Sequence, residues 1–371
     1  MNKAGIELAV VNVESLRTFT EDALKKSGLN EENARLVGDV LVEADLRGVH
    51  SHGVQNLPRW ARGFLKGHLK TEVESQPVED GVVSVIDGQG SLGVIASNIA
   101  MDLAIEKAKK YGVGFVGVKN SSHFGPAAYY TMKALDHNQI GFCTTNSPAV
   151  MAPWGGKEAL LGNNPFSYAI PAGEEPPIVL DAACSVSARG RIRMMARENE
   201  VLPEGWAITK DGEPTTDPRE AIEGTVLPFG GHKGYGLAVI NEILSAALTG
   251  ALFSFEVGEI SSGPAESELQ KHEQAAWGVG HLFGAIDINR FGNGQQFQER
   301  VAYLIRTIRE SEKAMGSERI LLPGELEAQL KTERQEHGIP LKDSTIDLIN
   351  TFAVEELGME RLESYFKMAE K

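Results

Sequence analysis

Three histidines lie in short polar turns beside glycines, where a side chain can face a cleft. His50 and His52 belong to the segment GVHSHGV, and His123 belongs to NSSHFGP. An imidazole titrates near pH ~6.5, so a cleft histidine can donate a proton to a ketone oxygen as hydride arrives and remove it in the reverse direction. A single turn histidine is more often structural. Together, the three are candidates for proton transfer.

The same three histidines suggest a zinc site as an alternative. A His-x-His pair with a distant third histidine can bind zinc and leave one position open to water, as in a zinc-dependent hydrolase. However, the sequence has no HExxH motif, only two cysteines and no carboxylate clearly fixed beside the pair. We therefore expect no metal.

A glycine-rich segment, PFGGHKGYG at residues 228–236, runs directly into an apolar helix. Backbone N–H groups, a helix N-terminus and a lysine converge there, which suits an anion such as a cofactor phosphate. The segment is not a Walker motif, and the alternative is a flexible loop with an exposed lysine. We favour an anion site at Gly231, His232 and Lys233.

The dinucleotide motif GxGxxG occurs twice, at residues 88–93 and at residues 112–117. The second copy ends a helix and enters a strand, whereas pyrophosphate binding needs a strand, a glycine turn and then a helix. The first copy has that order, but no Asp or Glu lies between Glu106 and Asp136, where a ribose-binding acid is expected. A plain turn is favoured over an NADP-type Rossmann site.

Composition and charge restrict the partners. The chain has 371 residues, enough for two domains with sizeable cores at ~150 residues per domain. Its 36 basic and 51 acidic side chains leave a formal net charge of -15, which repels nucleic-acid phosphates and anionic lipid headgroups. Nucleic acid and membranes are therefore poor partners. A small anionic substrate needs a local cluster of positive groups.

Cysteine usage and the N-terminal segment predict a cytoplasmic protein. Cys143 and Cys184 are the only cysteines, the first residues lack a signal-peptide pattern, and no apolar run approaches the ~18 residues of a membrane span. Cys184 follows an expected strand and has no adjacent base, so we interpret it as a buried apolar residue.

The elements that must position these groups follow two patterns. Residues 13–29 and 30–47 have helical apolar spacing, and charged amphipathic helices return after residue 325. Between them, short β-rich runs alternate with helices, which indicates an α/β layer architecture. Strands are expected at 82–87, 113–119, 140–146, 166–172, 177–183 and 281–288, and helices at 95–110, 127–135, 235–250 and 295–311.

These patterns divide the chain into two domains. Residues 1–78 and 325–371 are expected to pack together as a discontinuous helical domain, and residues 79–324 to form the α/β domain. The polar stretch near residues 258–274 is expected to be an exposed loop.

Seven ordered segments resemble the type 2 malate/L-lactate dehydrogenase family: GVHSHGV, NSSHFGPAAYY, GNNPFSYAIPA, IVLDAACSVSARGRIR, LPEGWAITKDGEPTTDP, GGHKGYGLAVINEILSAALTGA and HLFGAIDINRF. The resemblance covers nearly the whole chain. It implies a non-Rossmann nicotinamide-binding fold, three-layer α/β/α with a mixed sheet, and a homodimer that uses NAD or NADP. Ureidoglycolate, sulfolactate and diketogulonate dehydrogenases and cyclic imino-acid reductases are similar.

The resemblance also implies roles for individual residues. His123 is the first candidate for the proton-transfer group and His52 the second, with His52 orienting the substrate; the reverse assignment stays open. A catalytic Asp181 also stays open, because imino-acid reductases place an acid at a comparable position. Besides the glycine-rich segment, the positions that resemble cofactor contacts are Ser147, Asp181, Ala182, Ala183, Pro323, Gly324 and Glu325.

One departure concerns the substrate carboxylate. Many family members have an arginine where this chain has Asn56, which can form hydrogen bonds but supplies no charge. Arg59 or Arg47 can substitute, and Ser51 completes the set of substrate-binding candidates. The expected activity is interconversion of a small 2-hydroxy acid and a 2-oxo acid by an NAD- or NADP-dependent dehydrogenase. The alternatives are an NADPH-dependent cyclic imino-acid reductase, the zinc hydrolase and, least favoured, a noncatalytic binding module.

Overall fold

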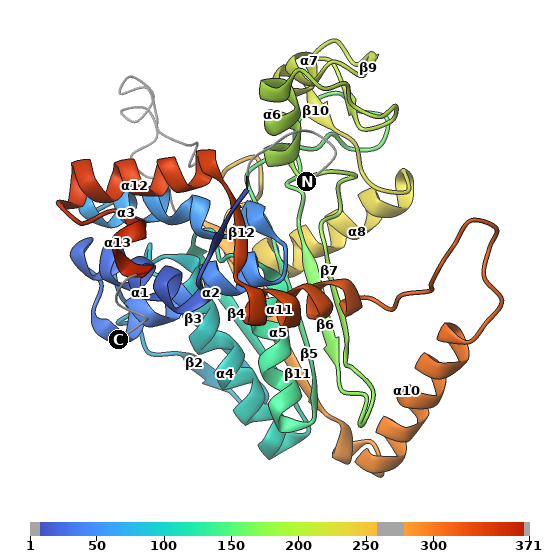
Figure 1. The fold of residues 1–371 in the computed structure, drawn as a ribbon. Helices are drawn as coiled ribbons and strands as arrows, with labels where there is room; N and C mark the ends of the chain where they lie inside the picture. The colour runs from blue at the N-terminus through green and yellow to red at the C-terminus, as the bar shows by residue number, and fades with distance from the viewer. Residues whose placement is uncertain (1–7, 258–277, 367–371) are drawn as a thin grey trace.

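A mixed seven-stranded sheet forms the centre of the molecule (Figure 1). The computed structural model describes residues 8–257 and 278–366. The strand order is β2-β3-β4-β11-β5-β6-β7, in which β3 and β4 are parallel and the other neighbours are antiparallel. The strands are β2 (Val78–Asp80), β3 (Val83–Asp87), β4 (Val113–Ser121), β5 (Gln139–Thr145), β6 (Phe166–Ile170), β7 (Ile178–Ala182) and β11 (Val279–Asp287).

Helices cover both faces of this sheet. The helices α4 (Gly93–Tyr111) and α5 (Ala127–Lys133) pack on one face, and α8 (His232–Glu242) with the π-helical turn Ile243–Ala247 packs on the other. A Cβ added at Gly114 of β4 would lie 2.2 Å from a backbone oxygen of α4, whereas one at Gly117 would lie 3.0 Å from Thr249. Residues three apart on a strand point to opposite faces. The expected three-layer α/β/α arrangement is confirmed.

The helical part joins both ends of the chain. Its helices are α1 (Val13–Lys26), α2 (Glu31–Leu46), α3 (Leu57–Leu65), α12 (Asp343–Leu357) and α13 (Leu362–Phe366). The side chains of Asn12 and Asn30 accept hydrogen bonds from backbone N–H groups at the starts of α1 and α2, as N-caps do. Apolar residues from both chain ends share one buried core.

A short antiparallel pair of strands reinforces this union. The strand β1 (Leu8–Val11) pairs with β12 (Ile339–Lys342), and Leu8 lies opposite Lys342. Neither strand was predictable from the sequence, because each run has only four residues and is flanked by helical patterns. The pairing fastens the N-terminal segment to the chain that follows α11 (Glu325–His337).

A small lobe extends from the central domain near the start of α8 (Figure 1). It contains the three-stranded sheet β10-β8-β9 and its own apolar cluster. The sequence predicted no separate unit here, since each strand has two residues. Its elements are α6 (Arg189–Glu198), β8 (Ala207–Ile208), β9 (Pro214–Thr215), α7 (Pro218–Glu223) and β10 (Thr225–Val226).

The larger predicted elements are present with small shifts at their ends. All six expected strands of the central sheet form. The helix expected at 235–250 begins earlier, at His232, and continues as a π-helical turn. The helix at 295–311 is α10 (Gly294–Arg309), which projects from the body of the molecule (Figure 1). The expected loop at 258–274 lies outside the described residues.

Candidate active site

A buried carboxylate holds the turn that carries the first two histidines. Asp45, at the end of α2, accepts a hydrogen bond of 2.7 Å from the backbone N–H of Val54 and lies 2.7 Å from Nδ1 of His50. A Cβ added at Gly53 would lie 2.2 Å from the Asp45 carboxylate oxygens, so only glycine fits there. The HSHG turn is therefore pinned onto the end of α2.

His50 is engaged in this support. Its Nε2 lies 3.2 Å from Nη1 of Arg334, while its Nδ1 faces Asp45. Since an arginine only donates, Nε2 accepts and Nδ1 donates to the carboxylate. His50 thus does not converge with His52 and His123 on a shared zinc position. Within residues 8–257 and 278–366, no group of three or more His, Cys, Asp or Glu side chains is placed to hold a metal ion.

His52 and His123 form the centre of the candidate site. Their rings stack with centroids 5.5 Å apart, and Trp60 lies against His123 at 5.9 Å. The backbone N–H of Gly125 donates to Nδ1 of His123 over 3.1 Å. In the neutral ring, the proton therefore resides on Nε2, the nitrogen left for a bound molecule.

Both rings are neutral near pH 7. Burial lowers the pKa of His52 to about 4. The pKa of His123 is lowered well below 6.5, first by burial and then by the positive charges that His52, Arg59 and His281 can carry. A bound anion would oppose this shift, because a nearby negative charge favours the protonated imidazole. An anion beside the two rings would therefore raise their proton affinity.

The turn at residues 88–93 supports His123 and is no phosphate loop. The N–H groups of Gly88 and Gly90 donate to carbonyls at the end of β4, and that of Gly93 donates to Oγ of Ser122. A Cβ at Gly93 would lie 2.1 Å from the Ser122 carbonyl oxygen. These donors are used within the protein, so the Rossmann interpretation of the turn fails on geometry.

Three substrate-binding candidates lie around the two rings. Ser51 Oγ lies 3.0 Å from Nδ1 of His52. The Asn56 amide donates to the backbone oxygens of Ser51 and Gly53, over 3.0 and 3.1 Å, which leaves only its acceptor oxygen for a ligand. A carboxylate would meet an acceptor there instead of a donor. Arg59 lies close enough to lower the pKa of His123, so a cation is present beside the stacked rings.

Arg47 and Asp181 form a second group. Arg47 is buried at the end of α2, and the positive charge of its side chain acts on the carboxylate of Asp181. Asp181 accepts a hydrogen bond of 2.8 Å from the backbone N–H of Ala128, at the start of α5. Asp181 is exposed at the end of β7, but the protein atoms around its carboxylate partly desolvate it and raise its pKa to about 6. Asp181 thus acts as an acceptor for the start of α5, directly after the His123 segment.

The glycine-rich segment has the chemistry that a cofactor phosphate requires. Gly230 and Gly231 adopt positive φ angles of 57° and 65°, and no atom lies within 4 Å of a Cβ placed on Gly230. His232 begins α8, and Lys233 is exposed without a hydrogen-bond or ion-pair partner among the described residues. Open backbone, a helix N-terminus and an unpaired lysine fit an anion. Trp154 borders this segment, 6.2 Å from the His232 ring.

The other candidate cofactor contacts differ in whether their polar groups already form hydrogen bonds within the protein. Ser147 donates to Oδ1 of Asn163 over 2.7 Å. Ala182 ends β7 and Ala183 follows it, beside Asp181. The carbonyl of Pro323 accepts from the N–H of Val179 of β7 over 3.0 Å.

Gly324 and Glu325 are fixed by the same part of the sheet. Gly324, with φ 87°, packs closely on Val179. Glu325 accepts from the N–H of Leu322 over 3.0 Å and pairs with Arg309, so both of its oxygens are engaged within the protein. A contact from Glu325 to a ribose or amide would compete with these bonds.

Sequence reasoning missed one histidine near this site. His281 of β11 is fully buried and lies against the His123 segment, where Phe124 stacks on it at 4.7 Å. From the sequence, only the histidines that lie in polar, glycine-flanked turns were selected as candidates, and His281 does not lie in one. The available signal was its context, HLFGAID, an apolar strand in which a histidine must have partners.

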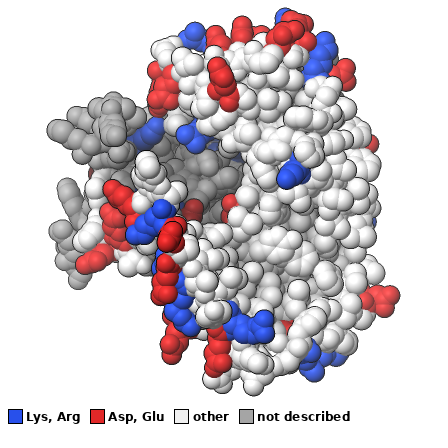
Figure 2. Space-filling model, turned by 90° about the vertical axis from the view of Figure 1, so that its right-hand side faces the viewer, with Lys and Arg blue, Asp and Glu red and all other residues white. Residues whose placement is uncertain are grey.

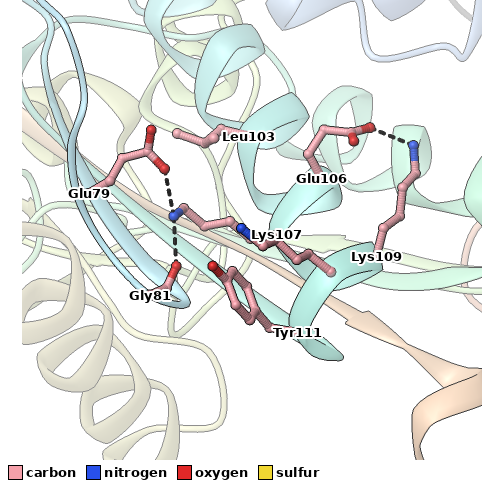
Figure 3. A pocket seen from close by; sticks show the side chains of 8 residues that line it. Glu79, Gly81, Leu103, Glu106, Lys107, Lys109 and Tyr111 are labelled. Carbon is pink, nitrogen blue, oxygen red and sulfur yellow. Dashed lines mark hydrogen bonds and ion pairs between the residues drawn. The ribbon is translucent and has the colours of Figure 1, made fainter.

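Two surface hollows lie apart from these groups. One, of about 540 Å³, lies at the end of α4 and contains three lysines (Figure 3). Its buried Lys107 pairs with Glu79 at 2.9 Å and donates to the carbonyl of Gly81 at 2.8 Å, so the charge of this lysine is already compensated within the protein. The other hollow follows the exposed side of α10. Among the described helices, none combines the length and apolar character that a membrane crossing requires.

Comparisons with known proteins match this arrangement. A sequence model of the malate/L-lactate dehydrogenase family matches residues 11–350. The L-sulfolactate dehydrogenase of Methanocaldococcus jannaschii is 41% identical over 88% of this chain and 92% of its own. The solved structure of the sulfolactate dehydrogenase from that organism superposes with a TM-score of 0.86, at 39% identity, over 96% of this chain and 100% of the other.

Two further relatives have their coenzyme in their names. The (2R)-3-sulfolactate dehydrogenase (NADP(+)) of Chromohalobacter salexigens is 31% identical over 93% of this chain and 98% of its own. The ureidoglycolate dehydrogenase (NAD(+)) of Escherichia coli is 30% identical over 90% of this chain and 93% of its own.

Proposed function

Because the chain belongs to the malate/L-lactate dehydrogenase family, we propose that it interconverts a small anionic 2-hydroxy acid and the corresponding 2-oxo acid with NAD or NADP. The observation that carries this proposal is the stacked pair of neutral histidines, His52 and His123, beside Arg59. The substrate class with the most support has two anionic groups, as malate and sulfolactate do, since Arg47 and Arg59 supply two cations.

The cofactor contributes one part of the chemistry: when bound, its nicotinamide gives or takes the hydride. The protein binds the cofactor and the substrate and orients them relative to each other. Lys233 and the N–H groups at the start of α8 would hold the cofactor phosphate, and Ser147 and the end of β7 would contact the rest of the cofactor. Arg59 attracts a substrate carboxylate to the histidines. Alignment of the reacting groups supplies most of the rate gain.

His123 exchanges the proton at Nε2, and His52 orients the substrate oxygen. In the doubly protonated His123 ring, Nδ1 carries a hydrogen and must release the Gly125 N–H. This loss and burial both make the imidazolium a strong acid, which gives its proton readily to a ketone oxygen. In the oxidation direction, neutral His123 must first present an unprotonated Nε2, which the same release permits.

The first experiment mixes the purified protein with NADH or NADPH, in EDTA, and follows cofactor absorbance on addition of sulfopyruvate, oxaloacetate, pyruvate, a sugar-derived 2-oxo acid or a cyclic imine. We expect oxidation of one cofactor by at least one dianionic 2-oxo acid. No turnover of any 2-oxo acid, with cofactor binding intact, would contradict the proposal. Turnover that occurs without EDTA but is lost when EDTA is added would instead indicate a required metal.

The histidine assignment is tested by substitution in the same assay. His123→Asn should lower kcat by about 10²–10⁴-fold, the usual contribution of general acid–base catalysis, whereas His52→Asn should raise KM more than it lowers kcat. His68→Asn, at an exposed position, is the control. Full turnover by His123→Asn would remove its proton-transfer role.

A second candidate reaction, reduction of a cyclic imino acid, is favoured by Asp181. Its pKa of about 6 lets it keep a proton nearer neutral pH than an ordinary aspartate. The cyclic imine in the panel and the variant Asp181→Asn distinguish this activity: imine turnover that depends on Asp181 would support it.

We also propose that the protein is a homodimer. The helix α8 and the turn after it expose four large apolar residues, namely Leu237, Ile240, Ile243 and Leu248, at 41, 53, 47 and 63%. The side of the molecule on which α8 and α10 lie has a broad area without charged side chains (Figure 2). In a chain with net charge -15, such an area is typical of an interface.

A further inference from the structure

The buried His281 connects the two strand ends that carry the candidate catalytic and cofactor residues. Its Nε2 lies 2.8 Å from Oγ of Ser121, and its Nδ1 lies 2.7 Å from Oγ1 of Thr145. Ser121 is the last residue of β4, two positions before His123. Thr145 is the last residue of β5, two positions before Ser147. Since β11 lies between β4 and β5, one side chain spans both junctions.

The hydrogen-bond directions define a continuous chain. The hydroxyl of Thr145 donates to the carbonyl of Asn146 at 2.8 Å, so its oxygen is left to accept from Nδ1 of His281. Nε2 then accepts from the hydroxyl of Ser121. Both ring nitrogens are satisfied, which a fully buried imidazole requires.

The backbone is shaped to make this bridge. The pairing of β11 with β4 shifts register between Val279 and His281, as at a β-bulge, while His281 lies directly opposite Thr145 on β5. Asn120, next to Ser121, has a positive φ of 52°. Bulges re-aim side chains at sheet ends and recur beside active sites. Phe124 stacks on the His281 ring with planes 10° apart, which fixes the residue after His123 as well.

We propose that His281 is a positioning residue: through Ser121 and Thr145 it sets the spacing between the His123 ring and the cofactor-binding end of β5. This inference rests on the proposed dehydrogenase function. A leucine would fill the same space without needing any hydrogen-bond partner, so the imidazole is suited to holding two loops in register. Since His281 has no exposed surface, it contacts neither substrate nor cofactor itself.

The test compares three variants of the full chain. His281→Leu removes both hydrogen bonds, and His281→Asn retains a donor near Thr145. Phe283→Leu is the matched control, because Phe283 lies two residues further on β11, on the same face, is fully buried and contacts Phe124. Each variant is assayed for kcat, KM and the primary deuterium isotope effect. Thermal unfolding and the ¹⁵N-histidine NMR spectrum are measured without cofactor.

We expect His281→Leu to lower kcat by about 10²-fold with a smaller change in KM and a larger isotope effect, because misplacement of reacting groups slows the chemical step. His281→Asn should recover at least a tenth of the wild-type kcat. In the NMR spectrum, His281→Leu should shift the His123 ring signals, identified by their absence in His123→Asn, while Phe283→Leu should leave them in place.

The outcomes separate this inference from the function on which it rests. If the wild type turns over a 2-oxo acid and His281→Leu retains its kcat, the positioning role is wrong and the dehydrogenase function stands. The positioning role is also wrong if kcat falls equally in Phe283→Leu at equal loss of thermal stability. If the wild type turns over no 2-oxo acid, the dehydrogenase function and this inference both fall.

Discussion

Arg59 and Arg47 differ in their surroundings, and this gives them separable effects on substrate binding. The positive charge of Arg59 lowers the pKa of His123, whereas that of Arg47 lowers the pKa of Asp181. We expect Arg59→Ala and Arg47→Ala each to raise KM for a dianionic 2-oxo acid about 10–100-fold, since a hydrogen bond to a charged group is worth ~1.5–3 kcal/mol. Steady-state kinetics with sulfopyruvate and pyruvate measure this.

The exposed Arg35 provides the control for that experiment, since its only ion pair among the described residues is with Glu31 of its own helix, at 3.5 Å. Arg35→Ala should leave KM unchanged. If Arg59→Ala raised KM for pyruvate as much as for the dianion, Arg59 would hold the shared carboxylate. An unchanged KM for both acids would remove it from substrate binding.

His281 also makes stability depend on pH. Burial lowers its pKa to about 3, below the ~6.5 expected in the unfolded chain. Below pH ~6.5 the unfolded chain therefore binds a proton that the folded chain does not, and stability is lost as pH falls from ~6.5 toward 3. Each pH unit in that window is worth up to ~1.4 kcal/mol.

We therefore expect urea unfolding of the wild type to lose free energy more steeply between pH 6.5 and 4 than unfolding of His281→Phe, which has no group that titrates there. His52, His123 and the carboxylates are common to both proteins and cancel in the comparison. Parallel stability curves would mean that His281 titrates normally.

Sequence reasoning identified the polar residues of the site better than their partners. It singled out His52 and His123, which the structure brings into contact. It could not predict that Asn56 and Glu325 form hydrogen bonds to other groups of the protein, since such bonds depend on how closely distant segments approach one another. Arg309 and Glu325, for example, are 16 positions apart along a loop.

At the scale of elements, close approach of α4 to the end of β4 determines where His123 lies. Gly93→Ala would place a Cβ 2.1 Å from the Ser122 carbonyl oxygen, and this atom belongs to backbone that cannot move without moving His123. We expect Gly93→Ala to lose about 1–3 kcal/mol of stability, as overpacked sites do, together with most of the activity.

A second helical glycine offers a contrasting control. Gly190 is also in the first turn of its helix, α6, but no atom lies within 4 Å of an added Cβ. Gly190→Ala should gain up to ~1 kcal/mol through helix propensity and retain activity. Denaturant unfolding and turnover of both variants measure the difference, and equal stability effects would contradict the packing argument.

Long elements with strong periodicity were predictable, whereas short ones were not. The strand β4 and the helix α4 appear within two residues of their expected ends. The strands β8, β9 and β10 have two residues each, which is too short for the alternation of apolar and polar residues that identifies a strand in a sequence. The π-helical turn after α8 also left no sequence signal, because its apolar residues continue the α-helical pattern.

For the whole molecule, the exposed apolar side of α8 leads to a prediction about assembly. We expect light scattering to give twice the 40.1 kDa mass of one chain. Ile240→Asp should shift the protein toward monomer and lower its stability, since it places a charge within an apolar interface. Val354→Asp, on the helix α12, should remain a dimer.

A monomeric wild type would contradict the dimer proposal but leave the fold and the candidate site as described. A dimer that persists in Ile240→Asp would move the interface away from α8. In that case the exposed side of α10, with Tyr303 at 69% and Leu304 at 51% exposure, is the next surface to test.

The pairing of β1 with β12 has a consequence for how the protein is made. Residues 8–11 leave the ribosome long before residues 339–342. The helices α1, α2 and α3 therefore lack the C-terminal segments that they pack against through most of translation. During that interval, their apolar faces are open to chaperones and proteases. The central α/β layers have no such delay, apart from β11, whose arrival completes the middle of the sheet. Slow or interrupted synthesis should therefore harm the helical part first.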